Sequence, residues 1–429
     1  MNQAIKKRIE EINSGRVPEG YKQTPFGIFP CDWETDKQYG DLFEFNASLS
    51  KSREELSEEG YAYLHYGDMH RNSFNKVSYQ QYSYLPKVNI SLKGKEKCLM
   101  KDGDVVFLDA SEDLDGTSRC VLIDNPNNEP FFAGLHTIPA REKGDNFSKW
   151  YKQYITLSDF VRKQFQHLAC GFKVYGLNKD TIAKINYAYP KSKTEQGKIA
   201  EILMKWDEMV ELQEQYIKKL EIRKKAVMKK LLTPKDGWKS VKLGSIAEMY
   251  AGGTPSTKNS EYWGGDIPWI QSGLIQNNYI DLKDIEGRIT EEGLLNSATA
   301  WIKQGSVLIA ITGSTCANIA YLKCDATANQ SVISITTQKA ESLFLFFYLQ
   351  GVRQQLLALQ NGSAQGGLTL KYLENFDVCL PARIDQKNIS NILLMTDEEI
   401  SLQKEKLEKI KAQRKILQQY LLTGIVRVK

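Results

Sequence analysis

The sequence predicts a mixed α/β (α+β) fold: two globular domains separated by a two-helix antiparallel coiled coil, with an internal pseudo-twofold repeat. Three observations support this prediction. The chain of 429 residues aligns with itself at an offset of about 190 residues. Two long stretches carry a heptad pattern, and the segments before them alternate short β-branched runs with polar loops. A chain of this length has room for two or three domains.

The internal repeat is clearest in the second part of each half. Residues 161–164 (Val-Arg-Lys-Gln) match residues 352–355 (Val-Arg-Gln-Gln) at an offset of 191. After a one-residue deletion, residues 231–233 and 421–423, both Leu-Leu-Thr, match at an offset of 190. The match weakens upstream, so each half has a divergent first part and a similar second part. A period this long predicts two duplicated domains rather than a solenoid.

Two stretches of about 40 residues predict long helices, each about 60 Å in length, that pair along a heptad seam. Gln213 and Gln403 interrupt the seams at equivalent steps, which predicts a central amide pair that fixes the register. Lys224 and Arg414 interrupt them nearer the ends, where we expect packed stems and charges that reach water. The predicted seam residues are Ile199, Leu203, Trp206, Val210, Gln213, Ile217, Leu220, Val227 and Leu231, then Ile389, Leu393, Ile400, Gln403, Leu407, Ile410, Leu417 and Leu421.

Strands and exposed loops are expected to dominate each globular domain. Residues 305–312 and 330–337 are β-branched runs separated by Gly, Ser, Thr and Asn, a pattern typical of strands joined by loops. The predicted segments are residues 1–20 (N-terminal segment), 21–190 (first globular domain), 191–235 (first long helix), 236–381 (second globular domain) and 382–429 (second long helix).

Composition excludes several classes of protein. The net charge is only +5, from 57 Lys and Arg against 52 Asp and Glu, which by itself does not indicate a polyanionic partner. The longest apolar run, residues 343–349, is far shorter than the ~20 residues that span a bilayer. Residues 1–11 are charged, so no signal peptide is expected. Seven cysteines without a CxxC pair favour a reducing, cytoplasmic compartment over a disulfide framework.

The sequence carries no recognisable catalytic motif. The phosphate-binding G-x-x-x-x-G-K-[ST] loop, the HExxH zinc motif and the G-x-S-x-G motif are absent, and the four histidines share no metal-ligand spacing. Residues 128–131 (Asn-Glu-Pro-Phe) match the Asn-Pro-Pro-Tyr/Phe signature of amino-methyltransferases only superficially, because the second proline is missing. We therefore expect no catalytic residue and no metal site.

Polar and aromatic side chains gather in the loops of both globular domains. Amide, hydroxyl, carboxylate and guanidinium groups read base edges when a rigid scaffold places them. One polar loop residue is more often a turn former, but recurrence in two domains favours recognition. The candidate DNA-binding residues are His65, Tyr66, Asp68, Arg71, Asn72, Asp109, Ser111, Thr117, Ser118 and His136, then Thr254, Ser256, Lys258, Trp269, Gln271, Ser272, Asn277, Thr312, Ser314, Thr315, Asn318, Asn329 and Gln330.

Several stretches make the whole chain similar to the specificity (S) subunits of type I restriction-modification systems. Three of them resemble parts of that family's target-recognition domains, and two resemble its helix-start motif and its usual C-terminus. The first domain departs from the pattern, because it lacks the Gly-Gly-Thr-Pro segment and carries an acidic stretch at residues 109–115. The matching stretches are residues 252–256 (Gly-Gly-Thr-Pro-Ser), 265–269 (Gly-Asp-Ile-Pro-Trp), 313–314 to 329–330, 190 with 195–200 (Glu-Gln-Gly-Lys-Ile-Ala), and 421–428.

The resemblance implies a non-catalytic subunit of a cytoplasmic methyltransferase/endonuclease complex. Each target-recognition domain would read half of a bipartite, asymmetric sequence in double-stranded DNA. The helices would dock two methyltransferase (M) subunits, and restriction (R) subunits would join through those. This chain would hold no cofactor, since S-adenosylmethionine belongs to the M subunit and ATP and Mg²⁺ to the R subunit.

Two alternatives stay open at this point. The chain is a self-sufficient DNA-modifying enzyme, which the missing motifs disfavour, or a coiled-coil scaffold whose heads bind carbohydrate or protein. Methyl transfer by the lone chain would favour the first alternative. Absence of DNA binding after co-purification with an M subunit would favour the second.

Overall fold

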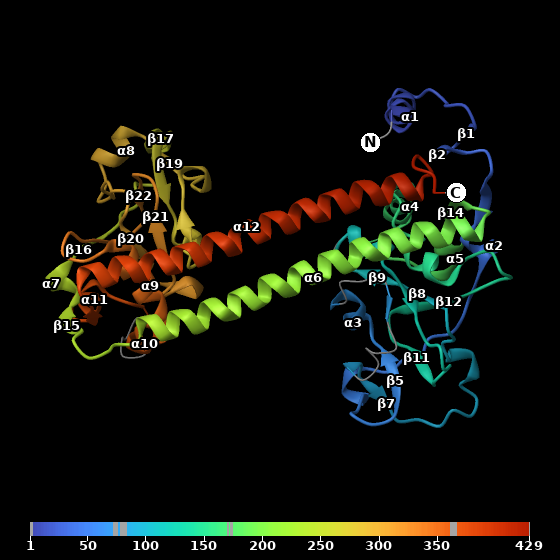
Figure 1. Ribbon diagram of the computed structural model, residues 1–429, viewed down its shortest axis with the longest axis horizontal. Coiled ribbons are helices and arrows are strands. Elements are labelled where there is room, and N and C mark those ends of the chain that lie inside the picture. The colour runs from blue at the N-terminus through green and yellow to red at the C-terminus, as the bar shows by residue number, and fades with distance from the viewer. Residues whose placement is uncertain are drawn as a thin grey trace. The chain divides into compact units, whose positions relative to one another are not determined.

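The computed structural model describes residues 3–71, 76–77, 84–169, 171, 175–360 and 367–428. The chain divides into two compact units, Met1–Glu214 with Lys406–Lys429, and Gln215–Glu405. Each unit contains one globular domain and parts of two long helices, α6 (Lys193–Leu232) and α12 (Arg383–Leu422), both drawn without interruption in Figure 1. Both helices have the 40 residues that the heptad pattern predicts.

A five-stranded sheet in the order β4-β12-β8-β10-β6 forms the centre of the first domain. Strands β6 and β10 are parallel, and the other neighbours are antiparallel. Strands β8 and β10 are buried along their whole length, which explains why both are continuous apolar runs in the sequence. The strands are Phe43–Phe45 (β4), Lys76–Val77 (β6), Val105–Leu108 (β8), Cys120–Ile123 (β10) and Thr137–Glu142 (β12).

The second domain repeats this sheet with the same topology. Its order is β16-β23-β20-β21-β18, again with the first strand beside the last and the second strand parallel at the edge. The duplication therefore extends to the divergent first part of each half. The strands are Glu248–Ala251 (β16), Tyr279–Ile280 (β18), Val307–Ala310 (β20), Ile319–Leu322 (β21) and Val332–Thr336 (β23).

Smaller ladders complete each domain. A three-stranded sheet accompanies the larger one in both, and a two-stranded ladder joins the beginning of each domain to the strand that precedes the long helix. The three-stranded sheets are Phe131–Ala133 (β11), Tyr61–Leu64 (β5) and Lys87–Val88 (β7), then Arg288–Ile289 (β19), Trp263–Ile270 (β17) and Thr327–Ala328 (β22). The ladders are Trp33–Gln38 (β3) with Asn186–Pro190 (β14), Lys239–Lys242 (β15) with Asp377–Leu380 (β24), Tyr21–Thr24 (β1) with Gly27–Pro30 (β2), and Ala110–Ser111 (β9) with Tyr175–Gly176 (β13).

Short helices cover the sheets. The longest apolar run of the sequence lies in α9, where Phe344–Leu349 are buried in the core of the second domain. Among the described helices, none combines the length and the apolar character needed to cross a membrane. These helices are Gln3–Asn13 (α1), Tyr39–Leu42 (α2), Tyr66–Arg71 (α3), Asp159–Leu168 (α4), Lys179–Ala183 (α5), Leu243–Ile246 (α7), Glu291–Leu295 (α8), Ser342–Gly351 (α9), Arg353–Gln360 (α10) and Leu370–Glu374 (α11).

The two long helices run antiparallel in each unit, as the sequence predicts. In the first unit Asp207 contacts Arg414 and Glu214 contacts Lys411, so residue numbers rise along α6 as they fall along α12. The equivalent pairs of the second unit are Lys224 with Asp397 and Glu221 with Lys404.

The predicted seam residues are all buried or half-buried. Apolar residues of the same helices that lie off the seam are exposed, for example Leu212 at 57% and Leu402 at 63%. Gln213 is buried in the first unit and Gln403 is half-buried in the second, and their central pairing stays a prediction.

Residues near the end of the chain complete the core of the first domain. Leu421 and Leu422 are buried among its aromatic side chains. The Arg427 guanidinium donates hydrogen bonds to Asp32 at 2.9 Å and to Glu195 at 2.6 Å, and the Tyr21 hydroxyl donates to the carbonyl of Gly424 at 2.6 Å. A segment far along the sequence is therefore an integral part of the first unit.

Candidate nucleic-acid interface

Several residues predicted in the first domain lie together around Tyr66, the exposed first residue of α3. The Tyr66 ring centre is 4.4 Å from that of His65 and 5.3 Å from that of His136. His136 Nδ1 lies 3.2 Å from Asp109 Oδ1, and Asp68 lies in the first turn of α3, two residues after Tyr66. Aromatic, imidazole and carboxylate groups from three separate segments thus share one surface.

His65 differs from its expected place on an exposed loop. It is only 5% exposed, because it directly follows the buried strand β5. Its Nδ1 accepts a hydrogen bond from the backbone N–H of Gly67 at 3.1 Å, and burial lowers the pKa of the imidazole. A neutral, buried His65 therefore orients the first turn of α3 and leaves little surface for DNA.

The acidic loop after β9 is held by its own buried hydroxyl groups. Ser111, Thr117 and Ser118 are each under 5% exposed, contrary to the exposure expected of loop residues. Thr117 donates to the carbonyl of Leu114 at 2.6 Å, and Ser111 accepts from the N–H of Asp113 at 3.3 Å. Thr117 and Ser118 lie in a 3₁₀ turn at Asp115–Ser118 and Ser111 lies in β9, and all three side chains support the loop from inside.

An ion pair between Arg53 and Asp68 adds charge to this site. The Arg53 guanidinium lies 3.4 Å from the Asp68 carboxylate, and no motif in the sequence indicates Arg53. Burial raises the pKa of Asp109, against the opposing effect of His136. Arg71 ends α3, although its side chain, like all of Asn72, lies outside the described residues.

In the second domain, amide side chains hold an irregular turn at the sheet edge. Asn277 accepts a hydrogen bond from the N–H of Ile319 at 3.2 Å, and its own amide lies 3.4 Å from the side-chain oxygen of Asn318. Arg353, which the sequence analysis missed, donates to the same oxygen at 3.1 Å and to the carbonyl of Ala317. Asn277 and Ala317 both have a positive φ, at 58° and 59°, so these bonds fix a strained backbone.

The glycine-rich stretch before β17 allows a close backbone approach. A Cβ at Gly252 or Gly253 would overlap backbone atoms, which accounts for glycine at both positions. Trp269 is only 6% exposed, because its indole donates to the carbonyl of Gly253 at 3.0 Å and its ring packs within β17. It supports the loop from below rather than standing exposed. Thr254 donates a hydrogen bond to Gln330, which lies in the loop between β22 and β23.

The candidate residues of both domains occupy the same edge of the repeated fold. In the first domain, Asp109 leaves β8 and donates its N–H to His136, directly before β12. In the second, Ile311 leaves β20 and donates in the same way to Ser331, directly before β23. By the shared edge we mean the rim of each domain at the C-terminal ends of two strands. These strands are β5 and β8 in the first domain, and their counterparts β17 and β20 in the second. The exposed candidates are Tyr66, His136, Ser256, Lys258, Gln271, Asn277, Thr312, Ser314 and Gln330, and the half-buried ones are Asp68, Asp109, Thr254, Ser272, Thr315, Asn318 and Asn329.

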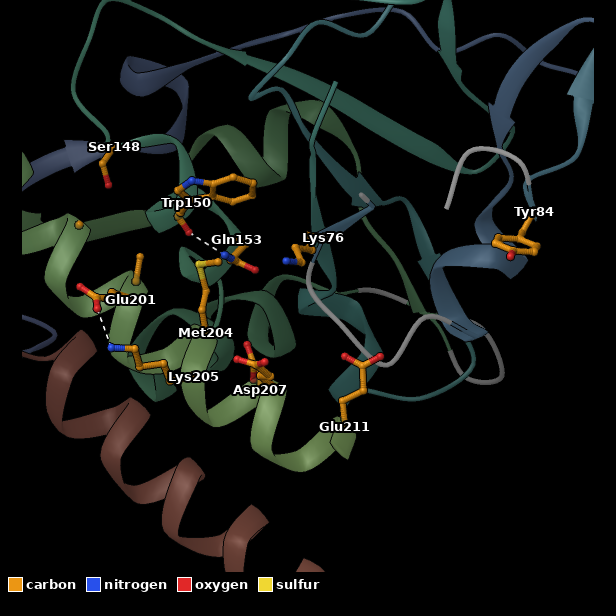
Figure 2. Close-up of a pocket in the computed structure, with 13 residues that line it drawn as sticks. Lys76, Tyr84, Ser148, Trp150, Gln153, Glu201, Met204, Lys205, Asp207 and Glu211 are labelled. Carbon is orange, nitrogen blue, oxygen red and sulfur yellow. Dashed lines mark hydrogen bonds and ion pairs between the residues drawn. The ribbon is translucent and has the colours of Figure 1, made fainter. Parts of the chain in front are cut away.

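A cavity of about 820 Å³ lies between α6 and the first domain (Figure 2). Its wall on α6 carries Glu201, Asp207, Glu208 and Glu211. Lys76 and Lys205 line it as well, and two of the carboxylates are paired, Glu201 with Lys205 and Asp207 with Arg414. Among the described residues, no candidate DNA-binding residue lines this cavity. In the described residues, no group of three or more His, Cys, Asp or Glu is placed to hold a metal ion.

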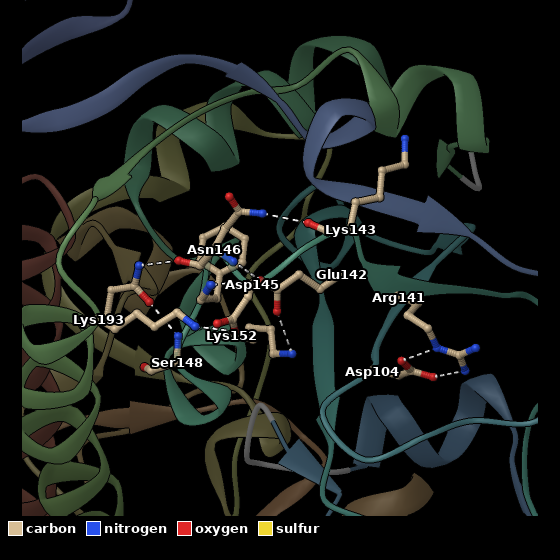
Figure 3. Close-up of polar contacts among 11 residues, drawn as sticks. Asp104, Arg141, Glu142, Lys143, Asp145, Asn146, Ser148, Lys152 and Lys193 are labelled. Atoms are coloured by element: carbon tan, nitrogen blue, oxygen red, sulfur yellow. Dashed lines mark hydrogen bonds and ion pairs between the residues drawn. The ribbon is translucent and has the colours of Figure 1, made fainter.

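Polar contacts fix the end of β12 and the loop that follows it (Figure 3). Arg141 donates to both carboxylate oxygens of Asp104, at 3.0 and 2.7 Å, and Lys152 contacts Glu142 at 3.1 Å. The N–H of Ser148 donates to the side chain of Gln196 in the first turn of α6 at 2.7 Å. The loop and the start of the long helix are therefore joined directly.

Two copies of one sheet, each presenting variable polar loops at an equivalent edge, define a protein with two repeated recognition modules. Residues 30–222 and 235–412 both match the family model described as "Type I restriction modification DNA specificity domain". The chain belongs to this family and carries two copies of its domain.

Named relatives agree with this assignment. The chain is 24% identical to the putative type I restriction enzyme MjaX specificity subunit of Methanocaldococcus jannaschii, over 96% of this chain and 97% of that protein. It is 30% identical to the type I restriction enzyme EcoR124I/EcoR124II specificity subunit of Escherichia coli, over 47% of this chain and 52% of that protein. Specificity subunits, as a class, are the non-catalytic members of their systems.

Solved structures share the fold at low sequence identity. The type I restriction-modification S subunit from M. genitalium superposes with a TM-score of 0.55 and 15% identity, over 91% of this chain and 96% of that one. A chain from a structure on complex assembly and conformational transition of the type I R-M system gives 0.61 and 14%, over 96% and 100%.

Proposed function

We propose that this chain is the DNA sequence-specificity subunit of a type I restriction-modification complex and reads a bipartite, asymmetric target with one domain per half-site. The observation that carries this proposal is the shared edge. Two domains of the same topology place polar loops at equivalent strand ends, while the residues in those loops differ. One scaffold with two sets of side chains suits a target whose two halves differ in sequence.

The chemistry of the exposed side chains supports base reading. Exposed Gln271 and Gln330 offer amides, which can form paired hydrogen bonds with a base edge, whereas the amide of Asn277 holds the turn beside Asn318. In the first domain Tyr66, His136 and Asp109 offer a different set of donors and acceptors. The buried His65 and Trp269 keep the loops rigid beneath these groups, so little conformational freedom is lost on binding.

The chain itself is expected to hold no cofactor and to perform no catalysis. In this proposal, two M subunits dock on the long helices and supply S-adenosylmethionine, and R subunits that use ATP and Mg²⁺ join through them in the cytoplasm. The exposed apolar residues of the helices, such as Leu212 and Leu402, offer surface for docking.

Exchange of one domain tests the assignment of one domain per half-site. Residues 236–381 are replaced by the homologous domain of another specificity subunit, and residues 21–190 are replaced in a matched control. Methylome sequencing of cells that carry each chimera should show a change in one half of the methylated sequence, with opposite halves altered in the two chimeras. A change of both halves in either chimera contradicts the proposal.

Methyl transfer and DNA binding separate the proposal from its alternatives. The purified chain should transfer no labelled methyl group from S-adenosylmethionine to DNA, and the complex with M subunits should do so at a defined sequence. Transfer by the chain alone would identify a self-sufficient enzyme. A complex that forms but binds no DNA would identify a scaffold with another ligand.

A further inference from the structure

Two polar attachments join the first domain to α6, in addition to Ile199, Ala200 and Leu203, which pack in the core of that domain. At the helix start, buried Gln196 donates to the carbonyls of Pro190 and Asn146, both at 2.8 Å, and accepts from Ser148. Three turns later, the Tyr154 hydroxyl donates to Asp207 at 2.8 Å. The two attachments are eleven residues apart, or about 16 Å along the helix axis.

The second domain has both attachments at the same spacing. Buried Gln386, the repeat counterpart of Gln196, donates to the carbonyl of Pro381 at 2.9 Å and accepts from the N–H of Glu341 at 2.8 Å. Eleven residues later Asp397 accepts a hydrogen bond from the Tyr279 hydroxyl at 3.0 Å.

A basic residue from the other helix completes each tyrosine–aspartate contact. Arg414 donates to Asp207 at 2.5 Å, and Lys224 lies 2.5 Å from Asp397. Both were expected to send their charges to water, but their side chains are only 22% and 20% exposed. The carboxylates are 15% and 14% exposed, so each charge is largely withdrawn from solvent and compensated by its partner.

The two tyrosines come from different elements of the two domains. The same contact is therefore made in both domains by tyrosines at positions that are not equivalent in the repeat. Tyr154 ends a 3₁₀ turn at Lys149–Tyr154, whereas Tyr279 begins the edge strand β18. The sequence repeat aligns the aspartates and the basic residues but gives no second copy of the tyrosine. In both domains the hydroxyl nevertheless contacts the same position of the helix pair.

We propose that the triads Tyr154–Asp207–Arg414 and Tyr279–Asp397–Lys224 are positioning residues that fix the orientation of each recognition domain on the helix pair. In each domain the glutamine and the apolar residues around it hold one end of the interface with the helices, and the triad fixes a second point about 16 Å away. Because each triad includes both helices, it ties the domain to the pair rather than to one helix. For DNA reading, which rests on the proposed function, the triads set the spacer length between half-sites.

Distance measurements on the full chain test the orientation directly. A spin-labelled non-natural amino acid replaces exposed Asn127 in the first domain and Lys415 on α12, both in the first unit. The distance between the two spin labels is then measured. Wild type should give one narrow distance distribution. Tyr154→Phe should broaden that distribution, because the domain loses its polar contact further along α6 and keeps only the contacts near the helix start and the end of α12.

Two further variants separate positioning from stability. Tyr63→Phe removes a buried hydroxyl whose hydrogen bonds go to the backbone of Leu49, Lys51 and Leu135, away from the long helices, so it should lower stability and leave the distribution narrow. Arg414→Lys gives the first triad the same three residue types as the second, and it should also leave the distance distribution narrow. An unchanged distribution in Tyr154→Phe, or equal broadening in Tyr63→Phe, overturns the inference.

Spacer preference in the complex with M subunits gives a second readout. Methylation of the native target is compared with targets whose spacer is one base pair longer or shorter. Loss of a hydrogen bond to a charged group should reduce this discrimination by roughly tenfold in Tyr154→Phe, with both half-sites unchanged. Unchanged discrimination contradicts the role in spacing. If no bipartite target is methylated at all, the proposed function fails, and the distance distributions still decide the orientation.

Discussion

The two globular domains differ most at the shared edge, the proposed DNA-reading surface, and least where they contact the helices. Their five-stranded sheets have one topology, and Gln196 and Gln386 make the same contacts at the helix start. At the shared edge, Tyr66 and His136 in one domain have no chemical counterpart in the other, where Asn277 and Gln330 are exposed instead. The duplicated fold thus separates a constant attachment from a variable reading surface.

The two domains also differ in the polar side chains that are buried beneath their loops. His65 and Trp269 both lie beneath the shared edge, and each hydrogen-bonds to backbone, although one is an imidazole and the other an indole. Each domain has its own way of stabilising loops at an equivalent place. A change of loop sequence therefore requires a matching change beneath it.

Truncation of the equivalent seam leucines should have the largest effect. Leu203 and Leu393 are fully buried at repeat-related positions, so Leu→Ala at either should cost about 2–5 kcal/mol of unfolding free energy. Leu212→Ala and Leu402→Ala are the exposed controls and should cost less than about 0.5 kcal/mol. Urea unfolding measures all four. A much larger loss at one buried leucine would break the equivalence of the two halves.

Loss of a buried polar group beneath the loops should have an intermediate effect and differ between domains. The Tyr63 hydroxyl donates to the carbonyl of Leu49 and accepts from the N–H of Lys51 and Leu135. Tyr63→Phe leaves these groups without their partner and should cost about 1–3 kcal/mol. Trp269→Phe removes one indole hydrogen bond together with the volume of the second ring of a buried side chain, so a cavity adds to the loss and the variant should cost more in the same urea unfolding experiment. The reverse order would contradict the assigned roles.

The pH dependence of the two domains should differ by the smallest amount. All four histidines lie within residues 21–190, and burial lowers the pKa of His65, opposed by Asp68 and reinforced by Arg53 and His136. A lowered pKa means that the folded domain disfavours the proton. The stability contributed by neutral His65 is therefore present above pH 6.5 and lost as the pH falls through the lowered value.

Hydrogen exchange between pH 7 and pH 5, corrected for intrinsic rates, measures this difference. Core peptides of the first domain should lose protection on acidification, and those of the second should change less. His65→Gln should reduce the loss, and the second domain serves as the internal control. Equal losses in both domains would assign the effect to carboxylates instead.

The long helices were predictable from sequence because a heptad pattern is local. Its steps of four and three place every seam residue, and the same count gives 40 residues for each helix. The sheet topology was not predictable, because strands such as β8 and β12 pair across residues that share no local signal. Strand pairing depends on contacts distant in sequence, where propensity has little weight.

The candidate site was predictable as a region but not residue by residue. Loops chosen for polar composition converge on the shared edge, yet His65, Ser111 and Trp269 proved buried. Tertiary packing decides whether a polar loop residue faces solvent or supports its neighbours. Arg53 and Arg353 act through distant partners, so no spacing in the sequence could have identified them.

The packing of Leu421 and Leu422 into the first domain has a consequence for synthesis. Leu421 follows Pro190, the last residue of β14, by 231 residues. At 5–20 residues per second, a ribosome needs roughly 10 to 50 s to cover that distance. Through this interval the nascent first domain lacks two side chains of its core. A chain cut short by a frameshift would keep that apolar gap open to chaperones and proteases, so quality control can remove it before assembly.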